Sequence, residues 1–142
     1  MTPVKRTISE KLTKYLKLFP IVVIVGPRQS GKTTFAKMEL PEWRYFDMEK
    51  PSDYGRISAD IEFFLEQYGE HCAIDEAQIL SELFPALRSY VDRKRDKKGR
   101  IVLLGSVIQH ISIFPHCSQL SLKLQFPLSK TPDNDAHNAA SW

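Results

Sequence analysis

The nine residues from Gly26 to Thr34, which read GPRQSGKTT, constrain this chain more than any other stretch. They match the phosphate-binding pattern G-x-x-x-x-G-K-[ST] at every fixed position. Its glycines let the backbone turn tightly, so that successive N–H groups can point at one anion. The pattern assigns Lys32 to the β- and γ-phosphates of a nucleotide and the Thr33 hydroxyl to Mg²⁺. The residues expected to contact nucleotide are Gly26, Pro27, Arg28, Gln29, Ser30, Gly31, Lys32, Thr33 and Thr34.

The residues on either side of this loop fit a phosphate site. Residues 21–25 read IVVIV, a β-branched run expected of a central parallel strand that is covered on both faces. Residues 33–38 predict the start of a helix, whose N-terminus favours negative charge. An ordinary Gly-rich turn between a strand and a helix is the alternative, and the strand together with the motif that follows argues against it.

A second motif, HCAIDEAQ, occupies residues 71–78. An apolar strand that ends in Asp-Glu is the Walker B pattern, and Asp75 follows Lys32 by 43 positions (75 − 32). Asp75 would hold Mg²⁺ through its water shell. Glu76 would orient or deprotonate the water that attacks the γ-phosphate. A strand that simply ends in a capped helix is the alternative for this stretch, but its pairing with the phosphate loop favours a Mg-nucleotide site.

Hydrophobic periodicity predicts further elements along the chain. Helices are expected over residues 7–19, 57–68 and 79–94, and strands over 43–47, 101–105 and 119–126. In the first helix, Thr7 and Glu10 have the spacing of a capping box. This helix either covers one edge of the core, which we prefer, or closes the base side of a bound nucleotide. The third helix consists of two pieces if Pro85 lies in a first turn.

Polar residues at other strand ends are further candidates for the site. Ser106 follows the strand over 101–105, where its side chain could sense the γ-phosphate; a plain helix N-cap is an equal alternative. Asp47 and Glu49 come at the end of the strand over 43–47, on the edge of the sheet where ligands bind. They could position water or Mg²⁺, and solvated turn carboxylates are at least as good an interpretation.

Length and composition favour one globular domain. Of 142 residues, we expect 1–128 to form the core, with 1–20 as an N-terminal helix leading into it, and 129–142 to be a disordered tail. The net charge of +3 and the basic residues at 93–100 give only weak support for a nucleic-acid or protein partner. Two cysteines and no apolar run of about 18 residues predict a cytoplasmic protein without membrane contact.

Together, GPRQSGKTT, the strand ending Phe46-Asp47, AIDEAQ, and GRIVLLGS at residues 99–106 resemble the bacterial and archaeal AAA-like P-loop ATPases. The resemblance covers roughly residues 3 to 106. It implies an α/β fold of three layers, α/β/α, with a mostly parallel five-stranded sheet in the order 5-1-4-3-2. It also implies ATP and Mg²⁺ as cofactors, and assigns Lys32 and Thr33 to phosphate and Mg²⁺, Asp75 to Mg²⁺, Glu76 to catalysis and Ser106 to sensing.

Two departures from that family bear on turnover. Family members carry an arginine beyond the Gly-Ser, and this chain has none after Arg100. Full-length members also continue into a C-terminal domain, so we expect a truncated product. The first hypothesis is Mg-dependent ATP hydrolysis by an ATPase. The alternatives are a nucleotide-binding module or remnant without turnover of its own and, less favoured, a P-loop kinase. The oligomeric state is left open.

Overall fold

The computed structural model of the chain describes residues 3–28, 30–94, 96–106 and 121–125, with 3–5 and 121–125 described by their backbone alone. Gln29 of the phosphate loop and the predicted tail at 129–142 lie outside the described residues. The elements, in chain order, are α1 (Pro3–Leu18), β1 (Ile21–Val25), α2 (Lys32–Glu39), β2 (Arg44–Asp47), α3 (Pro51–Ala59), α4 (Ile61–Tyr68), β3 (Cys72–Asp75), the short 3-10 helix η1 (Ala77–Ile79), α5 (Leu83–Asp92), β4 (Ile101–Gly105) and β5 (Ser121–Gln125).

The strands form one sheet in the order β2-β3-β4-β1-β5, and neighbouring strands are parallel throughout. An α/β fold with a parallel sheet is therefore confirmed. Side chains are described for the four strands from β2 to β1, and β5 is placed beside β1 by its backbone pairing. The strand predicted over 119–126 corresponds to β5. Because β4 lies between β1 and β3, the two strands that carry the predicted site are not direct neighbours.

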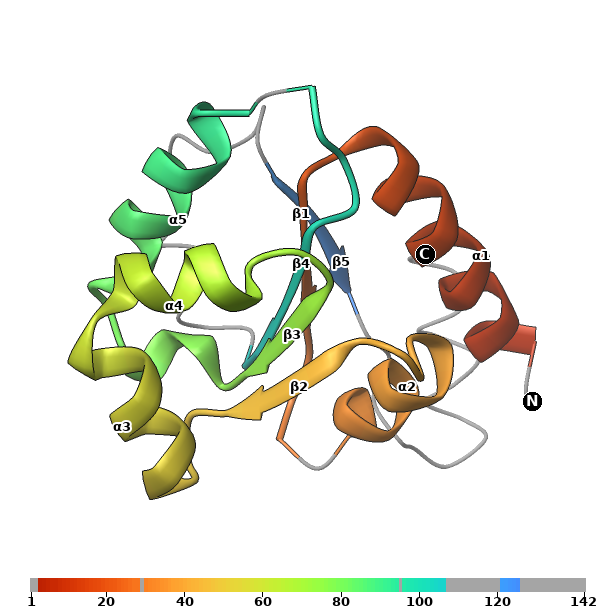
Figure 1. The fold of residues 1–142 in the computed structure, drawn as a ribbon. Coiled ribbons are helices and arrows are strands. Elements are labelled where there is room, and N and C mark those ends of the chain that lie inside the picture. Colours follow the sequence, from red (N-terminus) through yellow and green to blue (C-terminus); the bar gives the residue numbers. More distant parts are fainter. Residues whose placement is uncertain (1–2, 29, 95, 107–120, 126–142) are drawn as a thin grey trace.

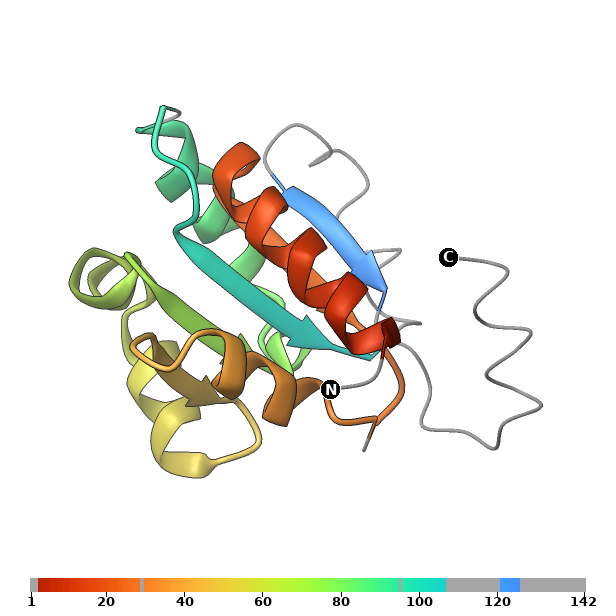
Figure 2. The same cartoon turned by 90° about the vertical axis from the view of Figure 1, so that its right-hand side faces the viewer.

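Helices cover both faces of the sheet: α3, α4 and α5 lie on one side and α1 and α2 on the other (Figure 1, and Figure 2 after a quarter turn). Successive side chains of β1 point to opposite faces, and all five of its residues are buried. Val22 and Ile24 pack with α1 and α2, and Val23 packs with the cluster under α3, α4 and α5. Each fully buried apolar side chain contributes about 1.5–3 kcal/mol. A strand buried on both faces explains the unbroken IVVIV run.

The first helix begins at Pro3, four residues earlier than predicted. Proline fits a first helical turn because its missing N–H would have no partner there. Thr7 therefore lies inside the helix, so the predicted capping box with Glu10 is wrong. Ile8 and Leu12 are buried against the sheet, as the apolar face of the helix requires. The helix does cover the core beside β1 and β5, as the preferred interpretation stated.

The helix predicted over 57–68 is two helices, α3 and α4. Asp60 separates them with an extended backbone (φ −159°, ψ 95°), and its carboxylate accepts a hydrogen bond from the Phe63 backbone N–H at 3.0 Å. This N-cap starts α4, and Pro51 starts α3 well before the predicted boundary. The apolar stripe continues across both helices, which is why periodicity alone joined them.

The helix predicted over 79–94 is also divided, into η1 and α5. Pro85 lies in the first turn of α5, where its lack of an N–H removes no helical hydrogen bond, so this part of the prediction is confirmed. No helix in the described part of the chain is long and apolar enough to cross a membrane.

Candidate functional site

The phosphate loop leaves β1 at the carboxyl edge of the sheet and turns into α2. The Gly26 backbone N–H donates to the Gly105 carbonyl at 3.2 Å, which ties the start of the loop to the end of β4. Gly31 ends the loop with φ 96° and ψ 9°, a left-handed conformation that glycine adopts without strain. Its carbonyl then accepts from the Phe35 N–H at 2.9 Å, the first turn of α2. The fixed glycine of the motif thus sets the direction of the helix.

Lys32, the first residue of α2, is folded back under the loop. Only 4% of it is exposed, and its Nζ donates to the Pro27 carbonyl at 2.8 Å. Burial lowers the pKa of Lys32, while the carboxylates of Glu76 and Asp75 act in the opposite direction. The ammonium therefore lies inside the curve of the loop, where the sequence pattern predicted a phosphate-binding charge.

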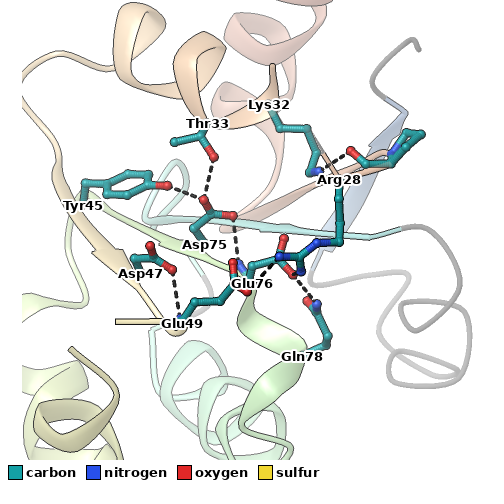
Figure 3. A network of polar contacts seen from close by, with 10 residues as sticks. Arg28, Lys32, Thr33, Tyr45, Asp47, Glu49, Asp75, Glu76 and Gln78 are labelled. Atoms are coloured by element: carbon teal, nitrogen blue, oxygen red, sulfur yellow. Dashed lines mark hydrogen bonds and ion pairs between the residues drawn. The ribbon is translucent and has the colours of Figure 1, made fainter. Parts of the chain in front are cut away.

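Asp75, at the end of β3, is the centre of a polar network drawn in Figure 3. Its carboxylate is nearly buried, with 7% of the residue exposed. Oδ2 accepts from the Thr33 hydroxyl at 2.6 Å and from the Tyr45 hydroxyl, and Oδ1 accepts from the Glu76 backbone N–H at 2.9 Å. The two residues predicted to hold Mg²⁺, Thr33 and Asp75, therefore lie side by side although 42 positions separate them.

Tyr45 of β2 is a member of this network that sequence reasoning missed. It pairs with Ala73 in the parallel register of β2 and β3, and Asp47 pairs with Asp75. Because residues two apart in a strand share a face, Tyr45 lies on the same face as Asp75. Burial, and then the hydrogen bond to the Asp75 carboxylate, raise the pKa of Tyr45 above its ordinary value. Its hydroxyl thus stays protonated and keeps donating to Asp75.

Glu76 follows Asp75 and is 6% exposed. Its backbone is left-handed, with φ 53° and ψ 46°, which is rare for a residue other than glycine. Such a conformation costs on the order of 1–3 kcal/mol and is found most often at functional sites. The Glu76 Oε2 atom accepts from Gln78 Nε2 at 2.6 Å and lies 3.7 Å from Nη1 of Arg28.

Arg28 and Glu49 complete the network at its solvent side. Arg28 Nη2 lies 2.8 Å from Glu49 Oε2, and both side chains are largely exposed. Glu49 reaches the site because the turn after β2 is closed by its N–H, which donates to Asp47 Oδ1 at 2.9 Å. The sequence left open whether Asp47 and Glu49 belong to the site or to a solvated turn. In the structure, Glu49 lies at the site and Asp47 shapes the turn.

These side chains surround a cleft of about 380 Å³. Its lining residues are Arg28, Gly31, Lys32, Thr33, Thr34, Glu49, Asp75 and Glu76. The lining is polar, with two cations and three carboxylates, and it suits a phosphate chain with a metal ion rather than an apolar ligand. Ser106 is half-buried just beyond β4 and does not line the cleft. Ser30 is buried, and its hydroxyl has no hydrogen-bond partner among the described residues.

A parallel α/β sheet whose first strand leads through a phosphate loop into a helix, with an acidic strand end beside it, is the architecture of a P-loop domain. The chain belongs to the AAA domain family, whose sequence profile matches residues 18–116. This family membership indicates a nucleotide-binding function of the ATPase type, and it confirms the resemblance inferred from the motifs.

Two curated relatives come from mycobacteria. The chain is 39% identical over 105 residues to the uncharacterized protein Mb2031c of Mycobacterium bovis and, to the same extent, to the uncharacterized protein Rv2008c of Mycobacterium tuberculosis. The matched region covers 72% of this chain and 23% of each relative. The chain therefore spans about a quarter of the length of these relatives.

Proposed function

We propose that the chain binds Mg-ATP in this cleft and hydrolyses it to ADP and phosphate. One observation carries the proposal: the phosphate loop and the Asp-Glu strand end, which lie far apart in the sequence, meet there through the 2.6 Å hydrogen bond between Thr33 and Asp75. A hydroxyl and a carboxylate are hard oxygen donors of the kind that Mg²⁺ prefers, so these residues fit the ion. The sequence contains no Asn-Lys-x-Asp motif, which would indicate specificity for guanine nucleotides.

Lys32 and the loop N–H groups would bind the β- and γ-phosphates, offsetting charge that builds up as the terminal P–O bond breaks. Bound Mg²⁺ would add positive charge at the same phosphates. Glu76 would orient the attacking water and accept its proton, so that the water oxygen bonds to the γ-phosphorus while the β-phosphate leaves with the bridging oxygen. For this role, Glu76 must first exchange its contacts with Gln78 and Arg28. Ser106 remains our proposed sensor of the γ-phosphate.

The test is phosphate release from Mg-ATP by the purified chain, with Lys32→Ala as the blank. We expect release in the parent and none in the blank. Glu76→Gln should keep nucleotide binding and reduce turnover by about 10²-fold to 10⁴-fold, the range of general-base contributions. Glu66→Gln, at an exposed position of α4, is the matched control and should match the parent. Full turnover in Glu76→Gln would remove Glu76 from the mechanism.

A nucleotide-binding module without turnover is the second candidate, because the Glu76 carboxylate is already engaged by Gln78 and Arg28. In addition, Arg28 is the only arginine lining the cleft within the described residues. A missing arginine finger would reduce the rate by about 10³-fold to 10⁵-fold. Tight binding of Mg-ATP without phosphate release would favour this candidate. A kinase is less favoured, since Glu76 after Asp75 suits water activation. Transfer of the γ-phosphate to an added acceptor would favour the kinase.

The basic segment at 93–100 offers little for a nucleic-acid partner. Lys97 Nζ and Arg100 Nε contact Glu70 at 3.3 Å and 3.0 Å, so part of this charge is paired within the fold. A cytoplasmic location and a nucleic-acid or protein partner stay predictions.

A further inference from the structure

Arg28 occupies a position at the cleft that the phosphate-binding pattern leaves unspecified. It lies on the phosphate loop four residues before Lys32, yet its guanidinium is directed to residues of other elements. Instead it bridges two carboxylates from other elements, with Nη2 at 2.8 Å from Glu49 and Nη1 at 3.7 Å from Glu76 (Figure 3). The two carboxylates exceed the single charge of Arg28, so this corner of the cleft carries net negative charge.

We propose that Arg28 is a ligand of the γ-phosphate, contributed by the same chain, and that it exchanges Glu49 and Glu76 for the terminal phosphate oxygens when ATP binds. The inference rests on the proposed function and deepens it, because it names the residue that distinguishes ATP from ADP. Of the described arginines, only Arg28 lines the cleft. Arg88 is exposed on α5 and does not line the cleft.

The contacts that hold Arg28 are suited to exchange. Its side chain is 62% exposed and that of Glu49 is 46% exposed, and ion pairs at such surfaces are weak because water screens them. A guanidinium can instead donate two parallel hydrogen bonds to a phosphate, a geometry stronger than its present pairing with separate carboxylates. Arg28 should therefore contact the γ-phosphate in preference to the two carboxylates once other oxygens of the phosphate are bound at Lys32.

The exchange has a second effect, on Glu76. Arg28 is one of two side chains that engage the Glu76 carboxylate, the other being Gln78. When the guanidinium moves to the phosphate, the Glu76 carboxylate loses one of these two partners. Binding of the γ-phosphate would then remove one of the two contacts that Glu76 must exchange before it can act on water, and binding of ADP would leave both in place.

Binding of AMP-PNP and ADP, each with Mg²⁺, to the whole chain tests this by titration calorimetry. In Arg28→Gln we expect AMP-PNP to bind about 10-fold to 100-fold more weakly, the range for a hydrogen bond to a charged group, while ADP stays within about 2-fold of the parent. Arg28→Lys keeps the charge but not the paired N–H donors of the guanidinium, so it should lose less affinity for AMP-PNP than Arg28→Gln. Glu49→Gln should strengthen AMP-PNP binding a few-fold, because it frees Arg28. Arg88→Gln is the matched control and should match the parent for both nucleotides.

Equal weakening of AMP-PNP and ADP in Arg28→Gln, or no change in either, would overturn the inference and leave the proposed function standing. A parent chain that bound neither nucleotide, with no difference from Lys32→Ala, would overturn both. Thermal unfolding of each variant verifies that it folds, which we expect because Arg28 is exposed.

Discussion

Tyr45→Phe tests the network that holds Asp75, the residue that we propose as a ligand of Mg²⁺. The Tyr45 hydroxyl is one of three donors to a carboxylate that is 7% exposed. The substitution removes that donor and keeps the ring, so packing around Ala73 and the neighbouring strand changes little. A hydrogen bond to a charged group contributes about 1.5–3 kcal/mol, and a buried acceptor left short of a partner loses that amount. We expect the free energy of unfolding to fall by the same range.

The assay is urea unfolding at pH 7 in the absence of nucleotide and Mg²⁺, supported by thermal unfolding. For a chain of 142 residues, the expected loss corresponds to a decrease of about 5–10 °C in Tm. Tyr54→Phe removes the same hydroxyl from an exposed position on α3 and serves as the control. Its free energy of unfolding should stay within about 0.5 kcal/mol of the parent.

A double-mutant cycle separates the charge of Asp75 from the geometry of the site. In the Asp75→Asn background the acceptor is neutral, and hydrogen bonds to neutral groups are about half as strong. Tyr45→Phe should therefore destabilise that background by about 0.7–1.5 kcal/mol, half of its cost in the parent. An equal cost of Tyr45→Phe in both backgrounds, or a cost below about 0.5 kcal/mol in the parent, would contradict a charge-assisted hydrogen bond to Asp75.

Three further predictions concern a helix cap and two titrating groups. Asp60→Ala removes the N-cap of α4 and should lower the free energy of unfolding by about 1 kcal/mol in urea; no change would mean that the cap adds nothing. Partial burial opposes the charge of Glu70, but hydrogen bonds and charge from Arg100 and Lys97 lower its pKa. Its contribution to stability is thus present above the unfolded pKa and lost as the pH falls through the folded one, so Glu70→Gln should flatten the loss of stability between about pH 5 and pH 3 in acid titrations. Burial lowers the pKa of Lys32, and bound phosphates would raise it. At about pH 9.5, ATP binding should therefore be accompanied by proton uptake, which calorimetry in buffers of different ionisation enthalpy measures. Proton uptake that is unchanged in Lys32→Met would contradict this.

Local patterns in the sequence predicted the strands that carry and adjoin the candidate site, because a strand's burial depends on a run of neighbouring residues. The run at 21–25 is buried strand β1, the Asp-Glu motif closes β3, and 101–105 is β4. Each follows from a continuous apolar run, which is typical of a strand covered on both faces. The meeting of Thr33 and Asp75 also agrees with the motifs, although the roles given to them, to Glu76 and to Ser106 stay predictions.

What the sequence could not supply are contacts set by register and turns. Tyr45 reaches Asp75 only because β2 pairs with β3 in one register, and a shift of one residue would place it on the other face. Arg28 meets Glu49 across 21 positions because a short turn after β2 brings the carboxylate back. The N-cap at Asp60 was missed for a different reason. An apolar helical stripe can continue across a cap, so hydrophobic periodicity does not reveal the break between α3 and α4.

The place of β4 in the sheet determines when the site can exist. The phosphate loop leaves β1 and Asp75 ends β3, but neither strand pairs with the other; each pairs with β4, which comes later in the chain. A nascent chain that has emerged as far as residue 94 carries both motifs without the strand that joins them. The two motifs would therefore be brought together only after the late strand inserts between two earlier ones.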